Sequence, residues 1–209
     1  LFFFLSGYFL NTSLPFFDFF KKRFNSLLKP YFFTIFLIYF FYVSFDTMGF
    51  ETALRRIVKS IYGSGLYIDW VQLWFLPHLF VVSLYAFFFY LVFGRWNNRY
   101  VRWIALVAAL GLSSLFLKDF YPFNLSVLGK QYELFGLPFS LDLVLLSGFF
   151  FILGSEVKQA LSEKVFENIP LLIGTGTAMI LMNVFLSPII DFNTRTYQSY
   201  LINTAEAVT

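Results

Sequence analysis

Long apolar runs, each close to the length needed to cross a bilayer, constrain this chain more than any other feature. A membrane-spanning helix needs about 20 mainly apolar residues. Six stretches approach that length, near residues 1–14, 27–45, 70–93, 100–117, 137–154 and 169–190. They lack the polar–apolar alternation of a membrane β-barrel, and an open sheet would leave backbone groups unpaired in lipid. The sequence therefore predicts an all-α, multi-pass transmembrane helical bundle of about six spans.

Composition agrees with a membrane protein and excludes several other classes. Of the 209 residues, 59% are apolar and 13% are charged, against about 25% charged in a typical soluble domain. These values exclude a disordered chain, a nucleic-acid-binding domain and an ordinary soluble enzyme, so the expected partner is the lipid bilayer. The chain has no cysteine and shows no cluster of metal ligands, so we expect neither a thiol nucleophile nor a metal.

The chain shows no internal repeat and no low-complexity linker, which predicts a single domain over residues 1–209. It begins inside an apolar run and ends in the polar tail AEAVT. We therefore expect this integral membrane domain to be truncated at both ends.

Basic residues are divided unequally between the two sides of the predicted bundle. With the cluster Lys21, Lys22 and Arg23 taken as cytoplasmic, alternation of the spans places nine basic residues on that side and six on the other. The positive-inside rule favours this orientation. The cluster either sets topology and touches anionic lipid, or holds the phosphates of a cofactor, and composition leaves both alternatives open.

Polar residues inside apolar runs are costly in a membrane and need a reason. Ser6, Gly7 and Tyr8 interrupt the first run, as a packing notch, a local kink or the lining of an internal path. Trp74 and the other tryptophans fall near predicted helix ends, where an interfacial aromatic belt is the simplest explanation.

The third and fifth runs each carry one ionisable residue close to a proline. His78, the single histidine, follows Pro77; it is either a hydrogen-bonded interfacial residue or a general base. No carboxylate lies at a helical spacing that would orient it. Asp142 lies just inside the fifth run, where it either caps the helix start together with Ser140 or faces a polar cavity.

The C-terminal part carries a second polar group. Asn183 lies within the sixth run, and Asp191, Asn193 and Arg195 follow at two-residue steps. In an extended segment these three side chains would face the same way. They form either a solvated loop or a site for sugar hydroxyls.

Several motifs in order resemble the membrane acyltransferase family called acyltransferase family 3. The first is LFFFLSGYFL followed by KKRFNSLLKPY. The later segments LWFLPHLF, LPFSLDLVLLSGFFFILG and MNVFLSPIIDFNTRTYQSYL are similar to the branch related to fucose 4-O-acetylases. The resemblance covers most of the chain.

The resemblance implies a multi-pass O-acyltransferase of a bacterial cytoplasmic (inner) membrane. Such proteins take an acyl group, usually acetyl from acetyl-CoA, and deliver it to a hydroxyl of a sugar or cell-surface glycan, which is a polysaccharide modification. The family's catalytic histidine lies on the first helix, and this chain is expected to begin at the second. We therefore expect no catalytic residue in the fragment, and His78 does not occupy the family's catalytic position.

By position within the same resemblance, Ser6, Gly7 and Tyr8 would line the path near the absent histidine. Lys22 and Arg23, with Lys21 beside them, would hold coenzyme A phosphates, although Ser26 stands where the family often has another basic residue. Further substrate-path candidates match polar or signature positions of the related branch: Trp74, His78, Asp142, Asn183, Asp191 and Arg195.

Two other classes remain as alternatives to the enzyme. A multi-pass transporter or flippase of a lipid-linked glycan fits the same composition and topology, although the internal repeat that many transporters show is missing. A membrane interaction protein without chemistry is less consistent with the polar residues inside the spans.

Overall fold

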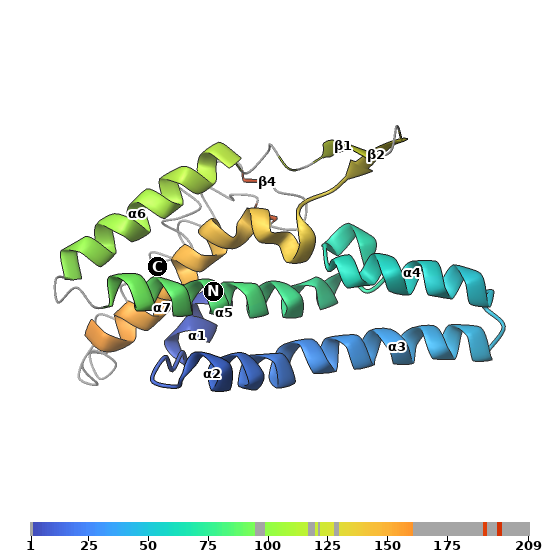
Figure 1. Ribbon diagram of the computed structural model, residues 1–209, viewed down its shortest axis with the longest axis horizontal. Helices are drawn as coiled ribbons and strands as arrows, with labels where there is room; N and C mark the ends of the chain where they lie inside the picture. The colour runs from blue at the N-terminus through green and yellow to red at the C-terminus, as the bar shows by residue number, and fades with distance from the viewer. Residues whose placement is uncertain are drawn as a thin grey trace, which may run out of the picture.

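The computed structural model describes residues 2–94, 99–116, 120, 122–127, 130–160, 190–191 and 196–197. The described part is mainly a bundle of helices, which Figure 1 shows. Its longer elements are α1 (Phe2–Tyr8), α2 (Phe16–Arg23), α3 (Lys29–Ser44), α4 (Phe50–Tyr62), α5 (Phe75–Phe93), α6 (Arg99–Phe116) and α7 (Val144–Ala160). Short helical turns join some of them: η1 (Phe24–Leu28), η2 (Gly65–Tyr67), η3 (Val71–Trp74) and η4 (Pro138–Leu143).

Three helical segments of the described chain are long and apolar enough to cross a membrane: Phe16–Ser44, Val71–Phe93 and Pro138–Lys158. They coincide with the second, third and fifth predicted runs. A shorter apolar helix covers Tyr100–Ser113, within the fourth run. The prediction of a multi-pass helical bundle is confirmed in this form.

The predicted number of about six spans is not confirmed. The first apolar run forms only the seven-residue helix α1, whose length of about 10 Å is a third of a bilayer core. The sixth run, near residues 169–190, lies almost wholly outside the described residues.

The described part of the chain is mainly helical, as an all-α bundle requires, but it also contains short strands. An antiparallel hairpin pairs β1 (Phe123–Val127) with β2 (Lys130–Leu134), and β3 (Ile190–Asp191) pairs with β4 (Thr196–Tyr197). The first hairpin lies between two apolar runs and extends away from the helices in Figure 1. Outside lipid, a hairpin's unpaired edges can bond to water, so the argument against open sheets does not apply there.

The segment Phe16–Ser44 is one continuous rod with a π-helical turn in it. Pro30 lies at the start of α3, and its ring lacks an N–H and clashes with the carbonyl four residues earlier, which belongs to Ser26. The π-helical turn η1 spans this residue. The widened turn accommodates the proline without ending the helix.

Helices α1 and α7 cross at two glycines. A Cβ atom added to Gly7 would overlap the backbone carbonyl of Phe151, and one added to Gly154 would overlap that of Phe4. Only glycine allows the two backbones to approach this closely, as in other small-residue contacts between membrane helices. The crossing holds α1 against the buried surface of α7.

Candidate functional site

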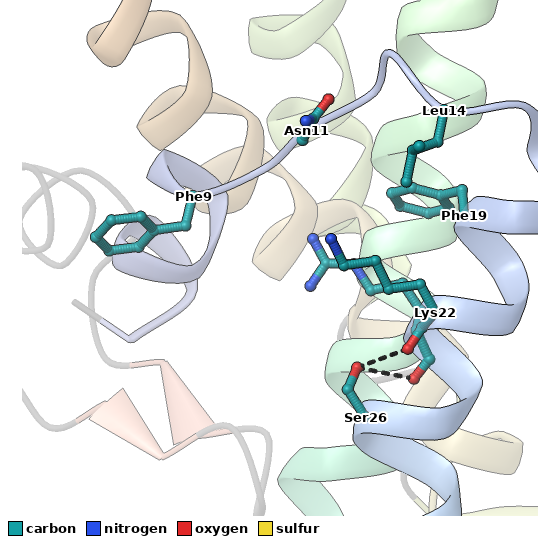
Figure 2. A pocket seen from close by; sticks show the side chains of 7 residues that line it. Phe9, Asn11, Leu14, Phe19, Lys22 and Ser26 are labelled. Carbon is teal, nitrogen blue, oxygen red and sulfur yellow. Dashed lines mark hydrogen bonds between the residues drawn. The ribbon is translucent and has the colours of Figure 1, made fainter.

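A pocket of about 130 Å³ lies where the segment after α1 faces α2 and η1. Its lining residues are Phe9, Asn11, Leu14, Phe19, Lys22, Arg23 and Ser26. Figure 2 shows the side chain of Lys22 extending from its helix toward the segment that carries Asn11. The pocket therefore combines two cations with an amide and a hydroxyl.

Local structure explains how the two cations come to share this pocket. The Ser26 hydroxyl donates to the carbonyl of Lys22 at 2.9 Å and lies 3.3 Å from that of Arg23, carbonyls whose helical bonds the π-turn disturbs. The Arg23 guanidinium lies over the Phe19 ring, 5.4 Å from its centroid, a favourable cation–π arrangement. Ser26 thus stabilises the turn that carries the cations.

The predicted basic cluster is divided by the structure. Lys22 and Arg23 line the pocket, whereas Lys21, on the same helix, does not. The path residues Ser6, Gly7 and Tyr8 lie on α1, whose chain continues directly into the pocket wall at Phe9. The structure therefore places two of the three predicted cofactor-binding residues in one pocket, whereas Ser6, Gly7 and Tyr8 precede its lining residue Phe9 in sequence and do not line it.

Helix α7, which crosses α1, carries a further cation beside that helix. Lys158, near the end of α7, places its Nζ 5.5 Å from the centroid of the Tyr8 ring. Tyr8 is adjacent in sequence to Phe9, which lines the pocket together with Lys22 and Arg23, so a third cation lies near that pocket.

His78 lies in the core rather than at an interface. Its side chain is fully buried, and its Nδ1 lies 3.0 Å from the carbonyl oxygen of Phe139. Since a carbonyl only accepts, Nδ1 carries a proton. Nε2 lies 2.8 Å from the hydroxyl of Ser147, which donates to it when the ring is neutral. The ring of Trp74 lies 5.4 Å away.

These contacts join three elements through one imidazole: α5 carries His78, η4 carries Phe139 and α7 carries Ser147. Ser147 is also 2.8 Å from the carbonyl of Leu143, so its single proton has two acceptors within reach. Both ring nitrogens are engaged and solvent is excluded. The arrangement orders the helices and supplies no open position for a substrate hydroxyl beside His78.

Asp142 and its neighbours form a strained turn at the start of α7. Phe139 and Ser140 both have positive φ, at 55° and 54°, which is uncommon outside glycine and costs of order 1–3 kcal/mol each. The Asp142 carboxylate accepts a hydrogen bond from the N–H of Leu137 at 2.8 Å. The buried Ser140 hydroxyl has no partner among the described residues.

The turn has a clear structural consequence. The positive φ values aim the Phe139 carbonyl at His78, and the Asp142 bond closes the turn from inside. Asp142 itself is buried. Its hydrogen bond to Leu137 therefore holds the loop before α7 in place.

An ion-paired group that the sequence analysis missed joins α5, α6 and α7. The nearly buried Glu156 carboxylate accepts three hydrogen bonds, from Arg102 Nε at 3.1 Å, from Arg102 Nη2 at 3.3 Å and from the Tyr90 hydroxyl at 3.0 Å. The signal was present, because Glu156 is an acid within the apolar run FFFILGSEVK, and such acids in membrane helices usually have a partner. The two partners are 54 and 66 residues away in sequence.

The remaining predicted residues lie near the C-terminus. Asn183 and Arg195 fall outside the described residues. Asp191 belongs to β3, where its backbone pairs with Thr196. Within the part of the chain that the structure describes, no group of three or more histidine, cysteine, aspartate or glutamate residues is placed to hold a metal ion.

The pocket at Lys22 and Arg23 is the strongest candidate for a binding site. Guanidinium and ammonium groups beside an amide donor suit an anionic group such as a phosphate. A volume of about 130 Å³ admits such a group but not a whole nucleotide cofactor, so most of a large ligand would lie outside it.

Comparison with known proteins gives the family. No curated protein and no solved structure matches the chain. A family model described as an acyltransferase domain, that of acyltransferase family 3, matches residues 1–206. Together with its membrane-spanning helices, this match over nearly the whole length shows that the chain belongs to this family of integral membrane acyltransferases.

Proposed function

We propose that the full-length protein transfers an acetyl group from acetyl-CoA to a hydroxyl of a sugar or cell-surface glycan. Membership of the acyltransferase family supports acyl transfer in general. The donor, the acceptor and the relation to fucose 4-O-acetylases rest on the motifs that resemble that branch. A bacterial inner membrane as the location rests on the same resemblance.

The observation that carries the choice of donor is the pairing of Lys22 and Arg23 in one pocket. Acyl-CoA carries its negative charge on phosphates, and charge-assisted hydrogen bonds to a phosphate are worth about 1.5–3 kcal/mol each. Asn11 and Lys22 lie on opposite sides of the pocket in Figure 2, and Arg23 lines it as well. This arrangement would hold a phosphate and leave the thioester free to extend along α1.

The reaction needs a base and a donor to the oxyanion. The acceptor oxygen attacks the thioester carbonyl and its proton passes to the base; the carbon–sulfur bond then breaks, and the leaving sulfur takes that proton to give the CoA thiol. The resemblance assigns the base to a histidine on a helix preceding Ser6, Gly7 and Tyr8. The burial and double engagement of His78 support assigning it a structural part.

The test is transfer of radiolabel from acetyl-CoA to glycan in membranes that hold the full-length protein. Replacing Lys22 or Arg23 with alanine should raise the KM for acetyl-CoA about tenfold, the effect of about 1.4 kcal/mol. Lys21→Ala is the matched control, since Lys21 lies on the same helix outside the pocket. Label that never reaches glycan while the protein is folded and present would refute the transferase and favour transport of a lipid-linked glycan.

A further inference from the structure

A second and larger pocket lies at the far end of α5 from Lys22 and Arg23. It has a volume of about 440 Å³ and is lined by Arg56, Lys59, Leu66, Tyr67, Asp69 and Phe135. That volume is within the range of about 300–1,000 Å³ found for small-molecule sites. The pocket joins the end of α4 to the loop before α5 and to the segment after β2.

The two pockets are separated by most of the length of α5. At the first pocket, Phe19 packs on Phe87, near the end of α5, with ring centroids 4.8 Å apart. At the second, Asp69 precedes η3, which leads into the start of α5. A 19-residue helix is about 28 Å long, so the second pocket is a site of its own.

The charges of this pocket do not balance. The Arg56 Nη1 donates to Asp69 Oδ2 at 2.6 Å, and the Tyr39 hydroxyl lies 3.2 Å from the same oxygen. The hydrogen bond and charge of Asp69 raise the pKa of Arg56 above its usual value, and the opposite formal charges of the two side chains offset each other. Among the described residues no carboxylate pairs with Lys59, which leaves one net positive charge on the lining.

The polar atoms that remain available suit a carbohydrate. Both bonds to Asp69 end on Oδ2, and among the described donors none reaches Oδ1, which can accept from sugar hydroxyls. The Asp69 side chain is 31% exposed and that of Arg56 is 44% exposed. A ligand can therefore reach both without displacing the pair.

The apolar wall of the pocket is held in place by hydrogen bonds. The Tyr67 hydroxyl accepts from the N–H of Phe135 at 3.3 Å, and the Ser64 hydroxyl donates to the Phe135 carbonyl at 2.6 Å. Tyr62 adds a bond to the Gly136 carbonyl at 2.8 Å. A positioned aromatic surface beside fixed polar groups is what the apolar face and hydroxyl edge of a sugar ring require.

We propose that this pocket binds an anionic sugar unit of the acceptor, with its acidic group at Lys59 and its hydroxyls at Asp69. The inference rests on the proposed acyl transfer and names the chemical class of its acceptor, a saccharide that carries a carboxylate or a phosphate. The net positive lining favours an acid over a neutral sugar. The separation from the Lys22–Arg23 pocket allows donor and acceptor to enter from opposite ends of the bundle.

The test measures sugar binding directly, without acyl-CoA. Full-length protein in phosphatidylcholine nanodiscs is titrated with glucuronate, glucose 6-phosphate and glucose by ligand-detected NMR. At least one of the two acidic sugars should bind about tenfold more tightly than glucose, which corresponds to about 1.4 kcal/mol. Whichever acid is preferred identifies the acidic group. Equal binding of all three sugars, or no binding of any, overturns the proposal.

Variants locate the binding. Lys59→Ala should reduce the affinity for the acidic sugar to that for glucose, and Lys59→Arg should restore it. Arg55→Ala is the matched control: Arg55 is exposed, pairs with Glu51 at 3.9 Å and does not line this pocket. An unchanged affinity of Lys59→Ala would overturn the assignment, as would an equal loss in Arg55→Ala.

The result separates this inference from the proposed function. If label moves from acetyl-CoA to glycan but acidic sugars do not bind preferentially, only the acceptor site is wrong. If acidic sugars bind through Lys59 and no acetyl group is transferred, the transferase proposal fails and the pocket stands as a saccharide site of another activity.

Discussion

The crossing of α1 and α7 yields the sharpest prediction for stability. A methyl group at Gly154 would overlap the Phe4 carbonyl oxygen and lie 2.9 Å from the carbonyl carbon and 3.0 Å from the Tyr8 nitrogen. Carbon atoms normally pack at about 3.5–4.0 Å. The obstructing atoms are backbone, so α1 must move away from α7 by roughly the difference.

The expected cost of Gly154→Ala follows from that displacement. Overpacking by one methyl group typically costs about 1–3 kcal/mol, and the upper part of the range applies because no side chain can turn aside. Gly111→Ala is the matched control, since a Cβ at Gly111 on α6 meets no atom of the described structure within 4 Å. Alanine should there stabilise the helix by about 0.5–1 kcal/mol.

The assay is thermal unfolding of the full-length protein in detergent, followed by tryptophan fluorescence. With about 2–4 °C per kcal/mol for a chain of this size, Gly154→Ala should unfold at least about 4 °C below Gly111→Ala. It should also raise the KM for acetyl-CoA, because α1 leads into the pocket at Phe9. Equal unfolding temperatures for the two variants would refute the close crossing.

Three further substitutions test the buried polar groups. His78→Ala should destabilise the protein by more than Ser147→Ala, because it leaves the Phe139 carbonyl unpaired, at about 1–3 kcal/mol; the same unfolding assay compares them, and equal losses would contradict it. Glu156→Ala should lower the free energy of unfolding by about 3 kcal/mol, because it leaves Arg102 without its carboxylate partner. In a double-mutant cycle, adding Arg102→Ala should recover part of that loss; strictly additive losses would argue against the ion pair. Asp142→Asn keeps an oxygen for the Leu137 N–H, so the unfolding temperature should change little. If the predicted substrate-path role of Asp142 holds, loss of its charge should impair label transfer, and normal transfer would count against that role.

The sequence identified many residues of the candidate site by their type, but it did not predict how they are placed relative to one another. The basic cluster and the Ser-Gly-Tyr motif were both recognised, and the π-turn can be rationalised from Pro30 alone. The pocket that Lys22 and Arg23 share with Phe9 and Asn11 came only from the structure. The sequence did not indicate that Asp142 bonds to Leu137. That bond depends on two residues with positive φ, which nothing in the local sequence requires.

What the sequence alone determined is the class of protein. Apolar runs of spanning length must satisfy their own backbone hydrogen bonds, so they become helices wherever they pack, and the order of motifs indicated the acyltransferase family. Those properties are local in the chain. The hairpin β1–β2 shows the limit of this argument, since it lies between the runs where lipid imposes no such requirement.

The tertiary structure alone decided which distant residues meet. The packing of the helices and their connecting loops brings His78 to the Phe139 carbonyl and Glu156 to Arg102. It also places Lys59 in one pocket with Asp69 and Phe135. Such contacts depend on the relative rotation and crossing of helices, which glycines such as Gly7 and Gly154 set by allowing backbones to touch. These helices are apolar on nearly all sides, so any face can contact lipid equally well. Their sequence pattern therefore carries little information about how each helix is rotated against its neighbours.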